Sequence, residues 1–120
     1  MNYKSMKRFS ILSLAALLLL CSCRNRTNNI TQEMAFEGVS NYCHREYDWS
    51  VAEGNPSLMY VQMEEGTDSE YHVLFRSYTG ALVHFYVDKT SGATRLVETV
   101  PALDIEAEAG TINLLDYLEK

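Results

Sequence analysis

The segment EYHVLFRSYTGALVHFYVDKTSGATRLVETV, residues 70–100, decides the fold. It contains three runs in which apolar and polar side chains alternate, and this is the period of a half-buried β-strand. Gly80 and the turn at residues 88–92 separate the runs, since glycine supplies the positive φ that a tight hairpin needs. Pro101 ends the third run because it has no N–H for the ladder. The segment therefore predicts an antiparallel meander of three strands.

A first hairpin centred on Thr79 divides the side chains of its two strands between two faces. The apolar face is expected to form the core: Tyr71, Val73, Phe75, Val83, Phe85 and Val87. The opposite face, called the mixed face below, is partly aromatic: His72, Leu74, Arg76, Leu82, His84 and Tyr86. One interpretation is an ordinary solvated sheet face, which antiparallel sheets commonly have. The other is a binding face, with His72, Arg76, His84 and Tyr86 as its candidate residues.

Residues 1–22 carry the features of a bacterial export signal. Three basic residues precede an apolar run over residues 11–20, which is too short to span a bilayer. The next residues, Leu20-Cys21-Ser22-Cys23, resemble a lipobox. This resemblance implies that Cys23 becomes the lipidated first residue of the mature protein. The alternative interpretation is a plain signal peptide with an incidental cysteine.

The residues after the signal predict the location and the domain organisation. Arg24 follows Cys23, whereas an aspartate at that position retains lipoproteins in the inner membrane of some bacteria. We therefore expect a lipid anchor in the outer membrane, and on its periplasmic side because no acidic cluster of the surface-export kind follows. Residues 23–29 are interpreted as the lipidated cysteine and a polar tether, and residues 30–120 as one small domain.

The charge of the mature part restricts its partners. The chain has 10 Lys and Arg against 16 Asp and Glu, and removing the three basic signal residues leaves a net charge of −9. Nucleic acid requires a basic surface, so it is not expected as a partner. With Cys23 lipidated, Cys43 has no disulfide partner, and we expect it to be buried.

The rest of the domain is predicted from helical spacing and from turn residues. An amphipathic stripe predicts a helix over residues 29–47, with Asn29 and Gln32 as its capping box. Trp49 is expected to close one end of the core. Residues 57–64 predict a further strand, which makes the meander four-stranded.

The C-terminal residues allow two interpretations. Residues 102–110 are read as a loose edge strand or an extended linker, and Thr111 as the cap of a short helix that docks on the mixed face. The predicted fold class is therefore α+β: an N-terminal helix packed on a four-stranded antiparallel meander, with a short C-terminal helix.

The sequence contains no catalytic constellation, and we predict that the protein is not an enzyme. Cys43 and His44 are neighbours on a helix and point about 100° apart, so they cannot act as a nucleophile and its base. His72 and His84 supply only two of the roughly four ligands that zinc takes. No metal and no cofactor are therefore expected.

The strands YHVLFRS and ALVHFYVD with the following KTSGAT, within residues 71–94, are similar to the PepSY domain. In that family a strand ending in Val-Asp leads through a Thr-Gly-type turn into the next strand; here Ser91 lengthens the turn slightly. The resemblance implies no catalytic residues and a role in inhibiting peptidases. The layout also resembles streptopain-type propeptides and their free-standing inhibitors. Cystatins have a similar architecture, but their Gln-x-Val-x-Gly loop is absent and nothing carries over.

The function that we predict is that of an exported, lipid-anchored, non-catalytic module that binds a protein or a peptide. Its expected partner is an exported peptidase, which it would restrain, or another protein of the cell envelope. One alternative is a structural or assembly accessory of the outer membrane. The other is a small-ligand binder on the mixed face, which a C-terminal helix packed over that face would exclude.

Overall fold

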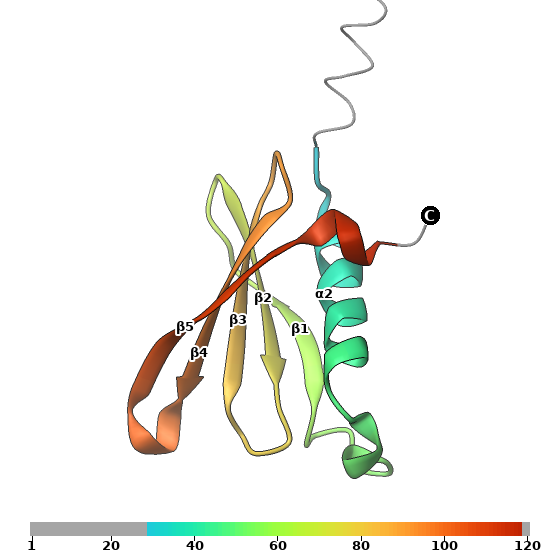
Figure 1. The fold of residues 1–120 in the computed structure, drawn as a ribbon, viewed down its shortest axis with the longest axis vertical. Helices are drawn as coiled ribbons and strands as arrows, with labels where there is room; N and C mark the ends of the chain where they lie inside the picture. The colour runs from blue at the N-terminus through green and yellow to red at the C-terminus, as the bar shows by residue number, and fades with distance from the viewer. Residues whose placement is uncertain (1–28, 119–120) are drawn as a thin grey trace, which may run out of the picture.

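The computed structural model describes residues 29–118, which form one α-helix packed on a five-stranded antiparallel sheet (Figure 1). Helix α2 spans Gln32–Glu46. The strands lie in the sheet in chain order: β1 Tyr60–Glu64, β2 Glu70–Arg76, β3 Leu82–Asp88, β4 Ala93–Val100 and β5 Ile105–Asn113. Short 3₁₀ helices complete the described part: η1 Trp49–Ala52, η2 Pro101–Leu103 and η3 Leu114–Tyr117. The predicted α+β class is confirmed.

The central hairpin has the register that the sequence predicts. Arg76 pairs with Leu82, which places Thr79 at the middle of the connecting loop. Gly80 and Gly92 have φ angles of 94° and 83°, the left-handed values that their turns require. The side chains of the predicted apolar face are buried on the side of α2, apart from Tyr71, which is half-buried: Val73, Phe75, Val83, Phe85 and Val87.

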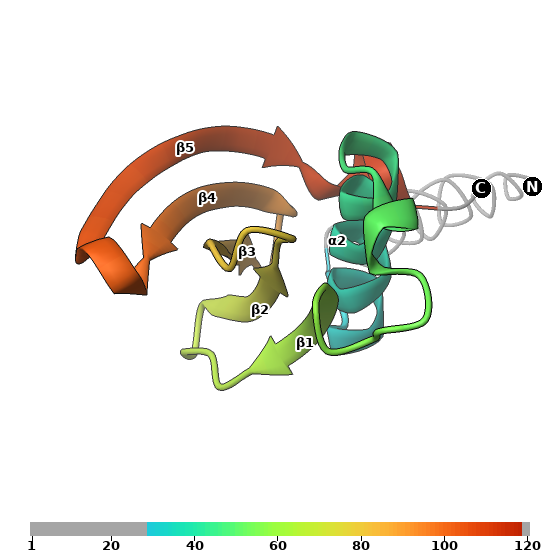
Figure 2. The same cartoon turned by 90° about the horizontal axis from the view of Figure 1, so that it is seen from below.

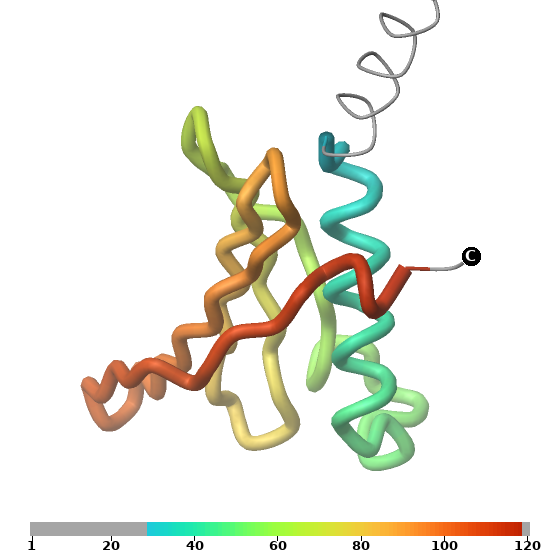
Figure 3. The backbone as a smooth tube through the Cα atoms, turned by 45° about the horizontal axis from the view of Figure 1, so that its top comes forward, coloured from blue at the N-terminus to red at the C-terminus, as the bar shows by residue number. Residues whose placement is uncertain are grey.

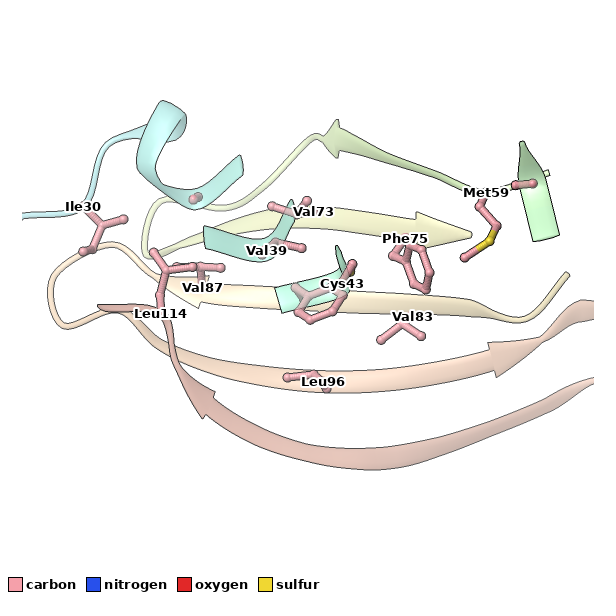
Figure 4. Packing of buried hydrophobic residues seen from close by; sticks show 13 residues of the cluster. Ile30, Val39, Cys43, Met59, Val73, Phe75, Val83, Val87, Leu96 and Leu114 are labelled. Carbon is pink, nitrogen blue, oxygen red and sulfur yellow. The ribbon is translucent and has the colours of Figure 1, made fainter. Parts of the chain in front are cut away.

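Helix α2 begins three residues after the predicted start because Thr31, and not Asn29, caps it. The Thr31 hydroxyl accepts a hydrogen bond from the Met34 N–H at 3.1 Å, and the Thr31 N–H donates to Met34 Sδ at 3.5 Å. Ala35, Val39 and Cys43 form the buried stripe of the helix. Figure 4 shows Val39 and Cys43 facing the core side chains of the sheet.

Trp49 closes the end of the core, as predicted. Its indole N–H donates to the carbonyl of Cys43 at 3.0 Å, and its ring centroid lies 5.7 Å from that of Phe75. Strand β1 begins at Tyr60, later than predicted, because Asn55 holds the preceding segment in a turn. The Asn55 side chain accepts hydrogen bonds from both the N–H and the hydroxyl of Ser57.

The predicted four-stranded sheet with a C-terminal helix was wrong, whereas the edge-strand interpretation of residues 102–110 was right. Residues 105–113 form a complete fifth strand, and Thr111 lies inside it rather than at the start of a helix. Strand β5 pairs with β4 along its whole length, whereas a helix starting at Thr111 would be too short to be stable alone. The chain then makes only one 3₁₀ turn, η3, which Asn113 caps by accepting a hydrogen bond from the Leu115 N–H at 3.1 Å.

The C-terminal turn packs beside α2, and not on the mixed face as predicted. Leu114 is fully buried next to Gly38, where any Cβ atom would collide with the leucine side chain. The Asn41 amide donates to the carbonyl of Tyr117 at 2.6 Å, and the rings of Tyr42 and Tyr117 meet edge-on at 5.2 Å. Glycine in the middle of α2 therefore makes the room that the tail fills.

Helix α2 covers only part of the sheet. Leu96, near the middle of β4, is 3% exposed, whereas Leu103 and Ile105 at the end of the β4–β5 hairpin are 66% and 50% exposed. Figures 1 and 2 show this end of the hairpin extending away from α2, and Figure 3 shows β5 returning from there towards the helix. We call residues 98–110 the distal hairpin.

The predicted signal and the predicted lipidation site, Cys23, lie outside the described residues. Within residues 29–118, no helix is both long enough and apolar enough to cross a bilayer.

Candidate functional site

The mixed face brings three of the four predicted binding residues together. His72 Nε2 lies 2.9 Å from His84 Nδ1, and His84 Nε2 lies 3.2 Å from the hydroxyl of Thr99. Tyr86 stacks on His72, with ring centroids 4.7 Å apart and planes 21° apart. The sheet register makes this cluster, since His72 and Tyr86 are paired residues of β2 and β3.

Arg76, the fourth predicted residue, does not join the cluster. Its guanidinium donates to the carbonyl of Leu58 at 2.6 Å and so ties β2 to the segment before β1. Arg95, which the sequence reasoning missed, lies over the Tyr86 ring at 4.5 Å and within 3.5 Å of the Glu70 carboxylate. The alternation of side chains along β4 could have identified Arg95, because it places this residue opposite Tyr86.

The two histidines form a hydrogen-bonded pair. One of the two facing nitrogens must carry the shared hydrogen. Burial, followed by the neighbouring His72, lowers the pKa of His84, while Glu106 and Glu64 act in the opposite direction. The neutral form of His84 is therefore favoured. Among residues 29–118, no group of three or more His, Cys, Asp or Glu side chains is placed to hold a metal ion.

The hollow beside this cluster is open and contains charges of both signs. Its volume is about 390 Å³, and Glu70, Tyr86, Asp88, Arg95 and Thr111 are among its lining residues. The C-terminal turn does not cover this hollow, so it does not exclude a small ligand there. Arg95, however, is already paired with Glu70 inside the hollow. The geometry favours a packed polar network over a ligand pocket.

Strand β5 is the second candidate site, and it is more exposed. It is an edge strand that pairs with β4 alone among the described strands, and eight of its nine residues are exposed. The opposite edge, β1, has five residues and contacts α2. An exposed edge presents backbone N–H and C=O groups with no partner in the sheet. In this protein β5 is therefore the longer and less protected of the two edges.

The register shows which backbone groups of β5 point outward. The Leu114 N–H donates to the Gly92 carbonyl at 2.9 Å, so alternate residues from Gly92 onward along β4 bond towards β5. A bulge after Leu96 shifts the partners, so that Glu98 faces Ala107 and Val100 faces Ile105. Ala107 and Ile105 thus bond to β4. Glu106 lies between these two residues and Glu108 follows Ala107. Both therefore direct their backbone N–H and C=O groups to the free edge of the sheet.

The same register fixes the side chains of β5. Glu106 lies opposite Thr99 and Glu108 opposite Val97, which places both carboxylates on the mixed face. Ala107 and Ile105 project from the other side of the sheet, the side that α2 covers farther along. The β5 edge is therefore acidic on one face and apolar on the other.

No protein-family model, no curated protein and no solved structure matches this chain. The resemblance to the PepSY domain stays a prediction.

Proposed function

We propose that this protein is a non-catalytic module that binds an extended segment of another protein by pairing it along the edge of β5. The observation that supports the proposal is the exposure of this edge, at eight of its nine residues. Addition of a strand to an exposed sheet edge is a recurring mode of peptide recognition, in which main-chain hydrogen bonds supply affinity. The distal hairpin makes this possible by holding the first part of β5, residues 105–110, away from α2 (Figure 1).

The proposed location is the cell envelope, with the module held by a lipid on Cys23 at the outer membrane and facing the periplasm. Its support is the lipobox-like motif before the domain. Stable anchoring by lipid needs more than one acyl chain, a condition that bacterial lipoproteins generally meet. An anchor of this kind would keep β5 within reach of exported proteins.

An exported peptidase is the specific partner that we propose, with restraint of its activity as the result. The support is the resemblance of residues 71–94 to PepSY, together with the exposed edge. A cleft that binds extended substrates offers backbone groups of the kind with which β5 can pair. An assembly accessory would instead form a stable complex without any effect on proteolysis.

Affinity capture from the native envelope tests the proposal with three forms of the full chain. Glu108→Pro removes an outward N–H while leaving the bonds to β4, and proline is tolerated at such edge positions. Glu108→Ala is the matched control, because it removes the same carboxylate and keeps the N–H. We expect the wild type to retain the partner, the alanine variant to retain it with only about a twofold loss of affinity, and the proline variant to lose it.

A peptidase assay then separates the two kinds of partner. A retained peptidase should be inhibited by the wild type and by Glu108→Ala, and not by Glu108→Pro. Equal retention by all three forms would show that the β5 edge is not the binding site. Retention of envelope assembly proteins with unchanged proteolysis would favour the accessory function.

A further inference from the structure

We infer that the segment bound by β5 carries Lys or Arg at alternate positions on one face and apolar residues on the other. This inference rests on the proposed function and specifies the chemistry of its partner. It follows from the two faces of the β5 edge, of which one carries the carboxylates of Glu106 and Glu108 and the other carries Ile105 and Ala107.

Within the described part of the chain, neither carboxylate forms a salt bridge with a cation. Among residues 29–118 the salt bridge joins Arg95 to Glu70, and the residues of β4 opposite Glu106 and Glu108 are Thr99 and Val97. A strand added outside β5 would place side chains directly opposite these carboxylates, at the spacing of a cross-strand pair. Opposite charges stabilise such pairs, so basic residues at alternate positions suit this face.

The other face of the added strand meets Ile105 and Ala107, with the exposed Glu98 one strand further in, opposite Ala107. Ile105 is 50% exposed, Ala107 is exposed, and Leu103, in the turn before β5, is 66% exposed. Because side chains alternate along a strand, the residues between the basic ones would project to this side. Apolar side chains there would remove this surface from water, which favours binding.

A second copy of this chain is a poor occupant of the same edge when the pairing is centred on residues 106–108. Antiparallel self-pairing about Ala107 sets Glu106 opposite Glu108, and pairing about either glutamate sets that residue opposite itself. Like charges directly opposite each other are destabilising. The charge that discourages self-association therefore favours a basic segment of another protein.

The first test uses synthetic peptides and the full chain purified from the envelope in mild detergent. A labelled short peptide that alternates Lys and Val should bind, as measured by fluorescence anisotropy. A peptide that alternates Glu and Val should not bind, and a peptide with its Lys and Val in two blocks should bind more weakly. Equal binding of the alternating and block peptides would overturn the inference, since only unspecific attraction would remain.

The second test changes the charge of the edge and keeps its backbone. The double variant Glu106→Gln/Glu108→Gln should bind the Lys-Val peptide about fivefold more weakly, as expected for the loss of two exposed cross-strand charge pairs. Glu33→Gln/Glu37→Gln, on the exposed side of α2, makes the same change in net charge and should leave binding unchanged. Equal weakening by both double variants would mean that net charge alone attracts the peptide, and the inference would be wrong.

The two proposals fail in different ways. If Glu108→Pro abolishes capture of the native partner while Glu106→Gln/Glu108→Gln has no effect on it, β5 pairing stands and the basic partner is wrong. If neither change affects capture, both proposals are wrong. Glutamates on an edge strand can also serve only to prevent aggregation, and in that case no peptide would bind.

Discussion

The covered half of the sheet and the distal hairpin share one sheet and one pairing pattern, yet they differ in what lies against them. Phe75 and Phe85 on β2 and β3 are fully buried beneath α2, whereas Ile105 on the same side of β5 is half exposed. Ladder hydrogen bonds are present in both. Pairing therefore keeps the distal hairpin in the sheet, whereas burial of apolar side chains supplies most of the stability elsewhere.

The largest expected difference between the two halves is in thiol reactivity. Burial raises the pKa of the Cys43 thiol to about 12, and the side chain is fully buried. A cysteine introduced on the distal hairpin by Ala107→Cys would be exposed. We expect maleimide to label it at least about a thousandfold faster than Cys43, because Cys43 reacts only after unfolding.

Mass spectrometry of the Ala107→Cys variant reads both sites in one molecule. The control is the same reaction in denaturant, in which the two cysteines should react alike. Rapid labelling of Cys43 in the folded protein would show that α2 opens readily and that the covered half is not a stable core.

Truncation of one side chain in each half compares their contributions to stability. Phe85→Ala should lower the free energy of unfolding by about 3–5 kcal/mol, as expected when a buried phenylalanine leaves a cavity. Ile105→Ala should change it by less than about 0.5 kcal/mol, since its side chain is already half in water. Urea titrations of the two variants measure both values, and similar losses would contradict the division into two halves.

Proline substitutions at neighbouring positions of β5 test the direction of its backbone groups. Ala107→Pro should destabilise the protein by about 2 kcal/mol, because it removes a ladder bond and leaves its acceptor on β4 unpaired. Glu108→Pro should cost clearly less, since its N–H points to solvent. Thermal melting compares the two. The reverse order would mean that the outward residues of β5 have been assigned to the wrong side.

The central meander could be predicted because its signals are local. The alternation of apolar and polar side chains specifies strands β2 and β3, and Gly80 and Gly92 specify the turns. Neither signal depends on the rest of the chain. The sequence of β5 is compatible with an edge strand or with a linker, because its acidic and small residues have weak strand preference. It becomes a strand because β4 offers a free edge, and that is a property of the assembled sheet.

The predicted tail helix was wrong for a similar reason. Leu114 packs into the core against Gly38, where the absence of a side chain leaves room for it. This contact joins residues that are far apart in the sequence. In the candidate site, alternation correctly placed His72, His84 and Tyr86 on one face. It could not show that Arg76 bonds the Leu58 carbonyl while Arg95 takes the place beside Tyr86.

The smallest expected effect is a pH dependence that connects the two halves through His84 on β3 and Glu106 on β5. Burial and the facing His72 hold the pKa of His84 below its usual value, whereas Glu106 raises it. The unfolded chain therefore binds the proton more readily than the folded protein does. The contribution to stability is fully present above the unfolded pKa of about 6.5 and is lost as the pH falls from there towards the lowered folded pKa.

Melting temperatures measured at about pH 7.5 and about pH 5.5 test this linkage, because histidine is the side chain that normally titrates in that range. We expect the wild type to lose more stability on acidification than His84→Asn, in which the titrating group is absent. Glu106→Gln should lose more than the wild type, since removing the carboxylate lowers the pKa of His84 further. If Glu106→Gln behaves like the wild type, then Glu106 does not act on His84, and the acidic face of the distal hairpin is electrically independent of the histidine pair.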